Sequence, residues 1–502
     1  MLKIIIFFVI ALSSFLGAQE ECISCHKIEK FDQKNHDFSC VECHIVPQKR
    51  DAYAHEDIIL HPDSPQTINL FCASCHQKDI NNVSKSLHTT LKGSLNLTRT
   101  LWGIKDSNVT LETLPLPKEH IKEPKDLVDD FLRRKCLKCH TGNQGSGEEG
   151  MYRGQNCMSC HMAYAQDGQY KGSDITMQGK KPYAKIHALS QKVEMSTCLS
   201  CHNKTFIGTD YQGVFPKDHD KSYRAPLTKE GLYPQSIYGT DYHSLNEDIH
   251  FQKGLTCMDC HTKNEMMGDG KSYENESQAT TTKCATCHKT LSKNEAHQTY
   301  HSKVSCSACH ASWQMSNYEL SVFRDDTKDY NKWKDLINQE DTYLANFLRN
   351  AIAAKQKPEP MMPDWVSGEM KEGIWYSGWR FRRWEHLLLG NTKEGIIKIL
   401  RPLFQYRISY RDKNGVMILD DVQSIDGKKI EAFMPYDPHT ITKNAKSCES
   451  CHENPLLINP PKNTNTVLDL LTGDVKNGTP LSKEQLDKLQ SQKYRNIRAK
   501  MF

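Results

Sequence analysis

Hydrophobic positions follow a helical period most clearly between residues 326 and 355. Apolar side chains there recur three and four positions apart, as expected for one buried face of a helix. Pro358 follows this stretch and would end a helix. The residues of the pattern are Trp333, Leu336, Ile337, Leu344, Phe347, Leu348, Ala351 and Ile352. We therefore predict a helix over 326–355.

Strand-like stretches follow this helix. Residues 404–410 and 416–419 flank the sequence Asp-Lys-Asn-Gly at 412–415, which is a strong signal for a hairpin turn. A second turn, Asp-Gly at 426–427, precedes the strand-like stretch 429–433. The pattern predicts a small helix-plus-β-hairpin subdomain near the C-terminus.

The two ends of the chain carry signals of their own. Lys3 precedes an apolar run at 4–12, and small residues lead to Ala18. This predicts a secretory signal peptide over 1–18, because the run is too short to span a membrane. At the other end, Ser482 and Gln485 form a capping-box pattern that predicts a helix with Leu486, Leu489 and Ile497 on one face.

Composition changes the picture, because hydrophobic residues make up only 37% of the chain and the mean hydropathy is −0.66. Aliphatic side chains alone are a poor core for this length. The 20 cysteines supply an explanation, since all fall in Cys-x-x-Cys-His motifs. In this motif both thiols attach to one haem and the histidine becomes the proximal iron ligand. Zinc knuckles and disulfides are the alternatives, but neither requires a histidine at that position.

The ten motifs predict ten covalently attached c-type haems, which would form much of the interior. The attachment cysteines are Cys22, Cys25, Cys40, Cys43, Cys72, Cys75, Cys136, Cys139, Cys157, Cys160, Cys198, Cys201, Cys257, Cys260, Cys284, Cys287, Cys306, Cys309, Cys448 and Cys451. The proximal ligands are His26, His44, His76, His140, His161, His202, His261, His288, His310 and His452.

The spacing of the motifs predicts the architecture. Nine motifs lie before residue 311, and no cysteine occurs in 311–447. We expect a signal peptide at 1–18, a nine-haem cytochrome domain at 19–325, a haem-free helix and β-hairpin subdomain at 326–434, and the tenth haem site with a C-terminal helix at 435–502. The fold class would be mainly α, with much irregular structure around a packed haem core.

Thirteen histidines remain outside the motifs and are candidates for distal iron ligands. If most of them serve, most haems are six-coordinate, which suits electron transfer. The alternative for any one of them is a surface histidine. The candidates are His36, His55, His61, His88, His120, His187, His219, His243, His250, His297, His301, His386 and His439.

Charge says little about partners. The peptide has a formal net charge of +4. Each ferric haem would add about −1 and each ferrous haem about −2, so the mature holoprotein would be anionic. The apparent basicity therefore does not indicate nucleic acid. Covalent haem attachment occurs outside the cytoplasm in bacteria, and we expect a location in the periplasm or at the outer membrane or cell surface.

Residues 242–310 resemble the multihaem cytochromes of bacterial respiration. The resemblance rests on Tyr-His at 242–243, Asp-Ile-His at 248–250, the motif at 257–261 and Gly-Asp-Gly at 268–270. The group includes pentahaem nitrite reductases, octahaem tetrathionate and sulfite reductases, and hydroxylamine oxidoreductases. Related sequences often have a histidine before the Gly-x-Gly, where this chain has Met266-Met267. The Cys-x-x-Cys-Lys motif of some members is absent.

Two functions fit this resemblance. The first, which we favour from the sequence, is an electron carrier of a respiratory chain between a membrane quinol-oxidising partner, or another cytochrome, and a terminal acceptor. The second is a terminal reductase of a small oxyanion such as nitrite, sulfite or tetrathionate. Arg380, Arg382 and Arg383 are its candidate site residues, since guanidinium groups suit oxyanions. Pairing with haem propionates is the alternative role for these arginines.

Overall fold

The computed structural model describes the chain in segments. They cover residues 22–28, 35–51, 53–106, 108–145, 147–204, 206–216, 237–238, 242–293, 296–297, 302–318, 320–330, 342–377, 381–384, 387–392, 394–403, 406–422, 433–447, 450–451 and 479–480. The predicted signal peptide, the turn at 426–427 and the helix predicted from Ser482 lie outside the described residues. In the described part, no helix is both long and apolar enough to cross a bilayer.

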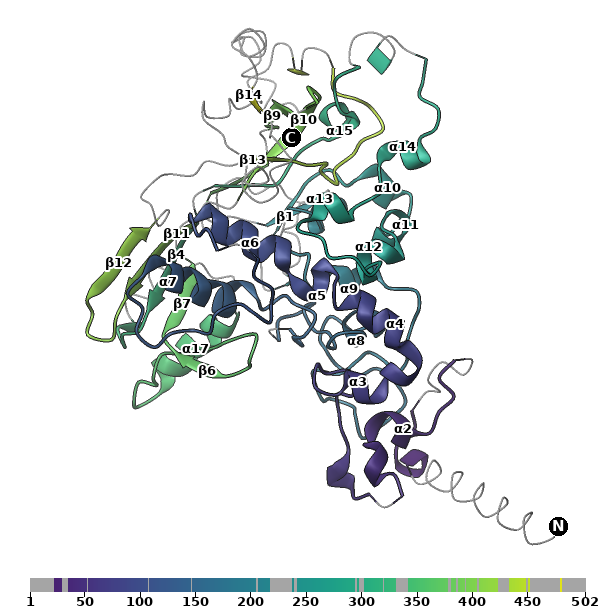
Figure 1. Ribbon diagram of the computed structural model, residues 1–502, viewed down its shortest axis with the longest axis vertical. Coiled ribbons are helices and arrows are strands. Elements are labelled where there is room, and N and C mark those ends of the chain that lie inside the picture. Colours follow the sequence, from purple (N-terminus) through teal and green to yellow (C-terminus); the bar gives the residue numbers. More distant parts are fainter. Residues whose placement is uncertain are drawn as a thin grey trace, which may run out of the picture. The chain divides into compact units, whose positions relative to one another are not determined.

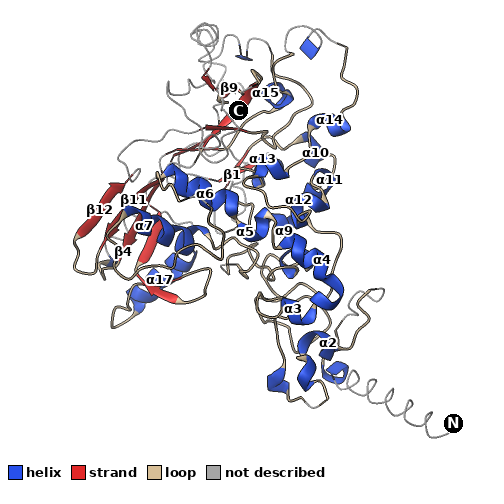
Figure 2. Ribbon diagram, viewed as in Figure 1, coloured by secondary structure: helices blue, strands red, loops and turns tan. Residues whose placement is uncertain are grey.

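The described part of the chain is mixed in secondary structure, with more residues in helices than in strands. Figure 2 shows short helices joined by long loops. Most of the described strands lie after residue 315. The expected irregular structure is confirmed. The expectation of a mainly α fold is wrong in part, because residues after 316 build two four-stranded sheets.

The chain divides into two compact units. The first contains Met1–Thr89, Cys139–Cys201 and Met266–Lys271, and the second contains Thr90–Lys138, His202–Glu265 and Ser272–Phe502. Helices of the first unit are α2 (Cys40–His44), η1 (Pro47–Lys49), η2 (His55–Asp57), α3 (Ile68–Phe71), α4 (Ala73–Val83), α8 (Met158–His161) and α9 (Met195–Leu199); α5 (Leu87–Thr90) lies at its boundary (Figure 1).

The second unit begins with longer helices and continues with short ones. These are α6 (Lys92–Leu101), α7 (Pro124–Phe131), the π-helical turn η3 (Leu132–Cys136), η4 (Thr209–Gln212), α10 (Ile249–Gln252), α11 (Cys257–Cys260), α12 (Lys263–Met267, at the boundary between the units), α13 (Glu276–Ala279), α14 (Cys284–Cys287), α15 (Cys306–His310) and α17 (Thr342–Ala353). The predicted helix over 326–355 is confirmed for Thr342–Ala353, which form α17. Residues 326–329 are not helical, and residues 331–341 are not described.

One four-stranded sheet has the order β12-β11-β4-β7. Its strands are β4 (Leu320–Asp325), β7 (Ile374–Ser377), β11 (Tyr406–Arg411) and β12 (Met417–Val422). The predicted hairpin is confirmed, since β11 and β12 pair antiparallel. Strand β11 also pairs in parallel with β4. Side chains of this sheet share one hydrophobic core with α7 and α17. Figure 1 shows the ribbons of these elements.

The second four-stranded sheet is antiparallel, with the order β13-β10-β9-β14. It contains β9 (Leu389–Asn391), β10 (Ile397–Pro402), β13 (Phe433–Pro435) and β14 (Thr479–Pro480). Three two-stranded pairs complete the strands: β1 (Val214–Pro216) with β2 (Tyr242–Ser244), β3 (Ser316–Tyr318) with β8 (Phe381–Arg383), and β5 (Met361–Pro363) with β6 (Met370–Glu372).

A buried network of charges ties α7 to the first sheet. Asp130 Oδ2 accepts from the indole N–H of Trp375 at 2.6 Å and lies 3.2 Å from Nη1 of Arg324. Arg324 also pairs with Asp326 at 2.9 Å, and the Tyr410 hydroxyl donates to Asp326. Asp130 and Asp326 compensate the buried Arg324 guanidinium. Removal of either carboxylate would leave a buried cation underpaired.

Candidate metal centres

Most motif cysteines lie on or beside a single turn of helix. In α11 and α15 the two cysteines stand three residues apart, a spacing that puts both thiols on one face of the turn. Local side chains begin these turns. Thr256 and Asp259 form a capping box at α11, and the Ser305 hydroxyl accepts from Ala308 N at α15.

The thiols are not joined to one another. None of the nineteen cysteines in the described residues forms a disulfide. Burial raises the pKa of Cys72 to about 12 and that of Cys157 to about 11, with smaller contributions from neighbouring acidic groups. Burial therefore favours the protonated thiol at both positions.

Among the described residues, five motif histidines each face a second histidine from outside the motifs. The ring centroids of these pairs are 6.0–6.4 Å apart. The pairs are His36 with His76, His44 with His187, His250 with His288, His261 with His439, and His297 with His310. In each pair, both histidines belong to the same unit.

This separation is the one expected for two imidazoles on opposite sides of one metal. A metal–imidazole bond is about 2 Å long, and roughly 1 Å more separates each nitrogen from its ring centre, so the centroids would lie about 6 Å apart. No group of three or more His, Cys, Asp or Glu side chains in the described part of the chain is arranged to hold a metal. The histidines come in twos, and this donor set suits the two axial positions of a haem iron.

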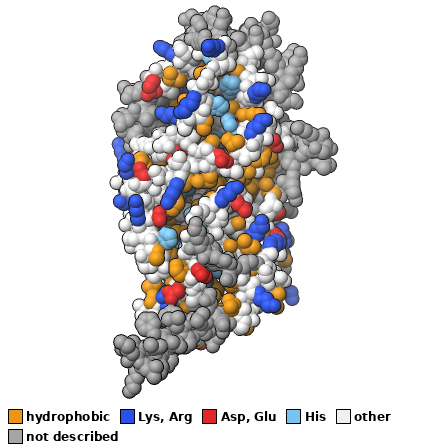
Figure 3. All heavy atoms as spheres, turned by 90° about the vertical axis from the view of Figure 1, so that its right-hand side faces the viewer, with side chains coloured by type: hydrophobic (Ala, Val, Ile, Leu, Met, Phe, Trp, Pro, Cys, Tyr) orange, Lys and Arg blue, Asp and Glu red, His pale blue; other side chains and the backbone are white. Residues whose placement is uncertain are grey.

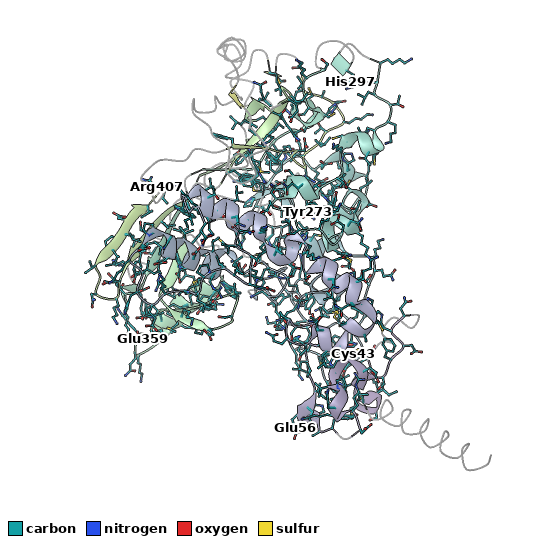
Figure 4. All side chains as sticks on the ribbon, in the orientation of Figure 1. Cys43, Glu56, Tyr273, His297, Glu359 and Arg407 are labelled. Carbon is teal, nitrogen blue, oxygen red and sulfur yellow. The ribbon has the colours of Figure 1, made fainter. Side chains whose placement is uncertain are left out.

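In several of these histidines, the ring nitrogen Nδ1 forms a hydrogen bond with a main-chain carbonyl. Nδ1–H of His44 donates to the Ile59 carbonyl at 2.7 Å, and that of His310 donates to the Thr442 carbonyl at 3.1 Å. His297, labelled in Figure 4, contacts the Ser292 carbonyl at 3.1 Å. Metal-binding histidines commonly donate their second N–H in this way. Nε2 is therefore the nitrogen that each of these rings would offer to a metal.

Other histidines use carboxylates as Nδ1 partners. Nδ1 of His26 lies 2.8 Å from the buried Asp174, and Nδ1 of His261 lies 3.2 Å from Glu265. Burial acts to raise the pKa of Glu265, but hydrogen bonds from Thr281, Thr262 and Thr282 outweigh it and lower the pKa to about 2. Glu265 is thus an anion beside a motif histidine.

The remaining described candidates lie in other surroundings. His55 and His120 are exposed, and His61 accepts from the Gln144 amide at 2.8 Å. His88 lies on α5, and its carbonyl accepts from Thr141. His243 is buried on β2, and its ring centroid lies 4.7 Å from that of Trp384. The candidates His219, His301 and His386 lie outside the described residues, as do Cys448 and His452 of the tenth motif.

The arginine cluster is only partly described. Arg380 lies outside the described residues. Arg382 and Arg383 belong to β8, where they pair with Asn317 and Ser316 of β3. The oxyanion role of the three side chains therefore stays a prediction. The residue pattern alone did not identify Asp174, Glu265 or Asp248 as histidine partners. The four-residue separation of His261 and Glu265, which lie on either side of the break between α11 and α12, was the available signal.

Histidines also reach the surface beside apolar side chains. Figure 3 shows histidine side chains (pale blue) next to hydrophobic side chains (orange) on the face that it presents. Large apolar side chains close to motifs are also exposed, including Ile23 at 49% and Phe38 at 51%. A flat apolar cofactor held by histidines would fit such surroundings.

One stretch of the chain is similar to a curated protein. It is 25% identical over 151 residues to the dissimilatory sulfite reductase MccA of Wolinella succinogenes. The match covers 26% of this chain and only 21% of that protein's length. No family model matches the chain, and no solved structure matches it significantly. The similarity is distant and partial, and it agrees with the resemblance to a group that includes sulfite reductases.

Proposed function

We propose that this chain is a multihaem c-type cytochrome. The motif cysteines would hold haem through thioether bonds, and the five histidine pairs would supply both axial ligands to five of the irons. The ring separations of 6.0–6.4 Å carry the proposal, because they recur in both units and each joins a motif histidine to a non-motif one. When bound, haem supplies one-electron redox chemistry at its iron. The protein supplies the ligands and the Nδ1 hydrogen bonds that orient them.

Of the two roles expected from the sequence, the similarity to a sulfite reductase favours the terminal reductase of a small oxyanion, with sulfite as the first substrate to test. Such a role needs an iron with an open coordination position and cationic groups beside it. Arg380, Arg382 and Arg383 remain the candidate residues for the oxyanion. The haems with paired histidine ligands would then pass electrons to that iron.

An electron carrier is the second candidate. The histidine pairs favour it, because an iron with two imidazole ligands has no open position for a substrate. In that case electrons would pass between redox proteins outside the cytoplasm, with a membrane quinol dehydrogenase or another cytochrome as the donor. The predicted signal peptide and the haem motifs support this location.

Oxidation of the reduced protein by candidate substrates distinguishes the two roles. Dithionite-reduced, desalted protein is mixed with sulfite, nitrite or tetrathionate, and haem reoxidation is followed by absorbance. A reductase reoxidises with one oxyanion, and Arg382→Gln lowers that rate while haem content stays constant. Arg349→Gln, at an exposed position of α17, is the matched control. No reoxidation by any of the three, in protein that transfers electrons to a cytochrome, would establish the carrier.

A further inference from the structure

The Nδ1 partners of the paired histidines differ in charge. His44 and His310 donate to neutral main-chain carbonyls. His261 and His250 instead contact carboxylates, at 3.2 Å from Glu265 and 2.8 Å from Asp248. The chain therefore has two kinds of paired centre that differ beyond their metal ligands.

Glu265 is held as a fixed anion. Its side chain is 2% exposed. Oε1 accepts from the main-chain N–H and the hydroxyl of Thr281 and from Thr282 N, while Oε2 accepts from Thr262 N and from His261. Solvent can barely screen this charge, and the carboxylate cannot rotate away from His261 without losing several hydrogen bonds.

Asp248 is fixed in the same way. Its side chain is 2% exposed. Oδ1 accepts from both the main-chain N–H and Nδ1 of His250, each at 2.8 Å, and Oδ2 accepts from Ile441 N at 2.7 Å. Ile441 lies two residues after His439, the ring paired with His261. Asp248 therefore connects the neighbourhoods of both carboxylate-bonded centres.

We propose that Glu265 and Asp248 lower the reduction potentials of the haems ligated by His261/His439 and His250/His288, below that of the haem ligated by His297/His310. This inference rests on the proposed function. A carboxylate that accepts the Nδ1–H makes the imidazole a more electron-rich ligand, and second-shell hydrogen bonds of this kind tune metal sites. A buried negative charge also favours the ferric over the ferrous iron. Both effects lower the potential.

The proposal places two low-potential centres next to each other in the second unit. Such centres hold an electron less strongly than the His297/His310 centre. Electrons in a partly reduced molecule would therefore collect outside this pair of centres, and the pair would be the last of the three to be reduced.

Two charge-neutralising variants test the proposal on the holoprotein. Glu265→Gln and Asp248→Asn each replace the acceptor by an amide, and asparagine retains the ability to cap α10. Glu276→Gln and Glu247→Gln are the controls, because both remove an exposed carboxylate from the same unit without touching an imidazole. Each protein is titrated spectroelectrochemically, and its low-spin ferric signals are followed by electron paramagnetic resonance.

We expect one haem in each test variant to shift upward in potential. At a fixed ambient potential its ferrous-to-ferric ratio should rise at least tenfold, which corresponds to about 59 mV for one electron. The g values of that haem should change as well, and the controls should leave both properties in place. Unchanged potentials in fully haem-loaded, low-spin Glu265→Gln and Asp248→Asn would overturn this inference alone.

Failure of the proposed function looks different. Protein without covalent haem, or haem that is not low-spin in the wild type, would overturn the proposed function itself. Several hydrogen bonds converge on the Glu265 carboxylate, so Glu265→Gln carries a risk of misfolding. If that variant does not fold, Asp248→Asn decides the outcome.

Discussion

Replacement of His439 by glycine removes one ring of one pair and leaves the rest of that pair in place. The His261 and His439 centroids are 6.2 Å apart with ring planes 14° from parallel, so an iron midway would lie about 3 Å from each centroid. The main-chain N–H of residue 439, which donates to Asp210 at 3.1 Å, survives the substitution. The local backbone should therefore hold, with an imidazole-sized space beside one iron.

The size of the effect follows from the number of motifs. If all ten carry haem, one centre accounts for about a tenth of the ferric haem. His439→Gly should convert about that fraction from low-spin to high-spin, and added imidazole should restore the low-spin form by filling the space. Electron paramagnetic resonance and magnetic circular dichroism measure both changes.

His120→Gly is the matched control, since this distal candidate is exposed and has no partner ring among the described histidines. Its spectrum should equal that of the wild type. Low-spin haem that is unchanged in His439→Gly, or lost equally in both variants, would refute the assignment of His439 as a ligand.

Three further predictions follow from other features. Intact mass spectrometry of the mature protein should show about 6 kDa above the peptide mass, at roughly 0.6 kDa for each of ten haems; a mass for eight or fewer would contradict the motif count. The His250/His288 planes lie 69° apart and those of His297/His310 only 16°. The haem ligated by His250 and His288 should give a more anisotropic low-spin signal in electron paramagnetic resonance than the haem ligated by His297 and His310. The reason is that near-perpendicular imidazole planes leave the iron dπ orbitals nearly degenerate. Asp130→Ala should destabilise the protein by about 3–5 kcal/mol in urea unfolding followed by circular dichroism. Glu359→Ala, which removes an exposed pair with Lys328, should cost about 1 kcal/mol or less, and equal losses would refute the role of burial.

The hairpin was predictable because its signals are local. Asp412 Oδ1 accepts from Asn414 N and Val416 N, and Gly415 has a positive φ of 80°, which glycine adopts at no steric cost. The parallel partner of β11 was not predictable in this way. Strand β4 lies far upstream, and nothing in the turn chemistry specifies a contact with it.

The histidine pairs show the same contrast between local signals, which the sequence carries, and long-range contacts, which it does not. The sequence identifies a class of spare histidines, but it does not assign each to a motif. His297 pairs with His310 of the next motif downstream. His250 also precedes a motif closely, yet it pairs with His288 rather than with His261. Tertiary folding decides these assignments, because His439, the partner of His261, lies far downstream in the sequence, after β13.

The short stretch from His439 to Thr442 has a consequence for how such a chain matures. It provides the ring opposite His261, the N–H that holds Asp248, and the carbonyl that orients His310. If the chain is exported, as we propose, it emerges from its N-terminus, and the motifs at 257–261, 284–288 and 306–310 leave the membrane before this stretch does. Their cofactors could be attached early, but the surroundings of all three would be completed only when residues 439–442 arrive, about seven-eighths of the way along the chain. A truncated product would then carry cofactor without its finished coordination, and proteases could distinguish it from the full-length protein.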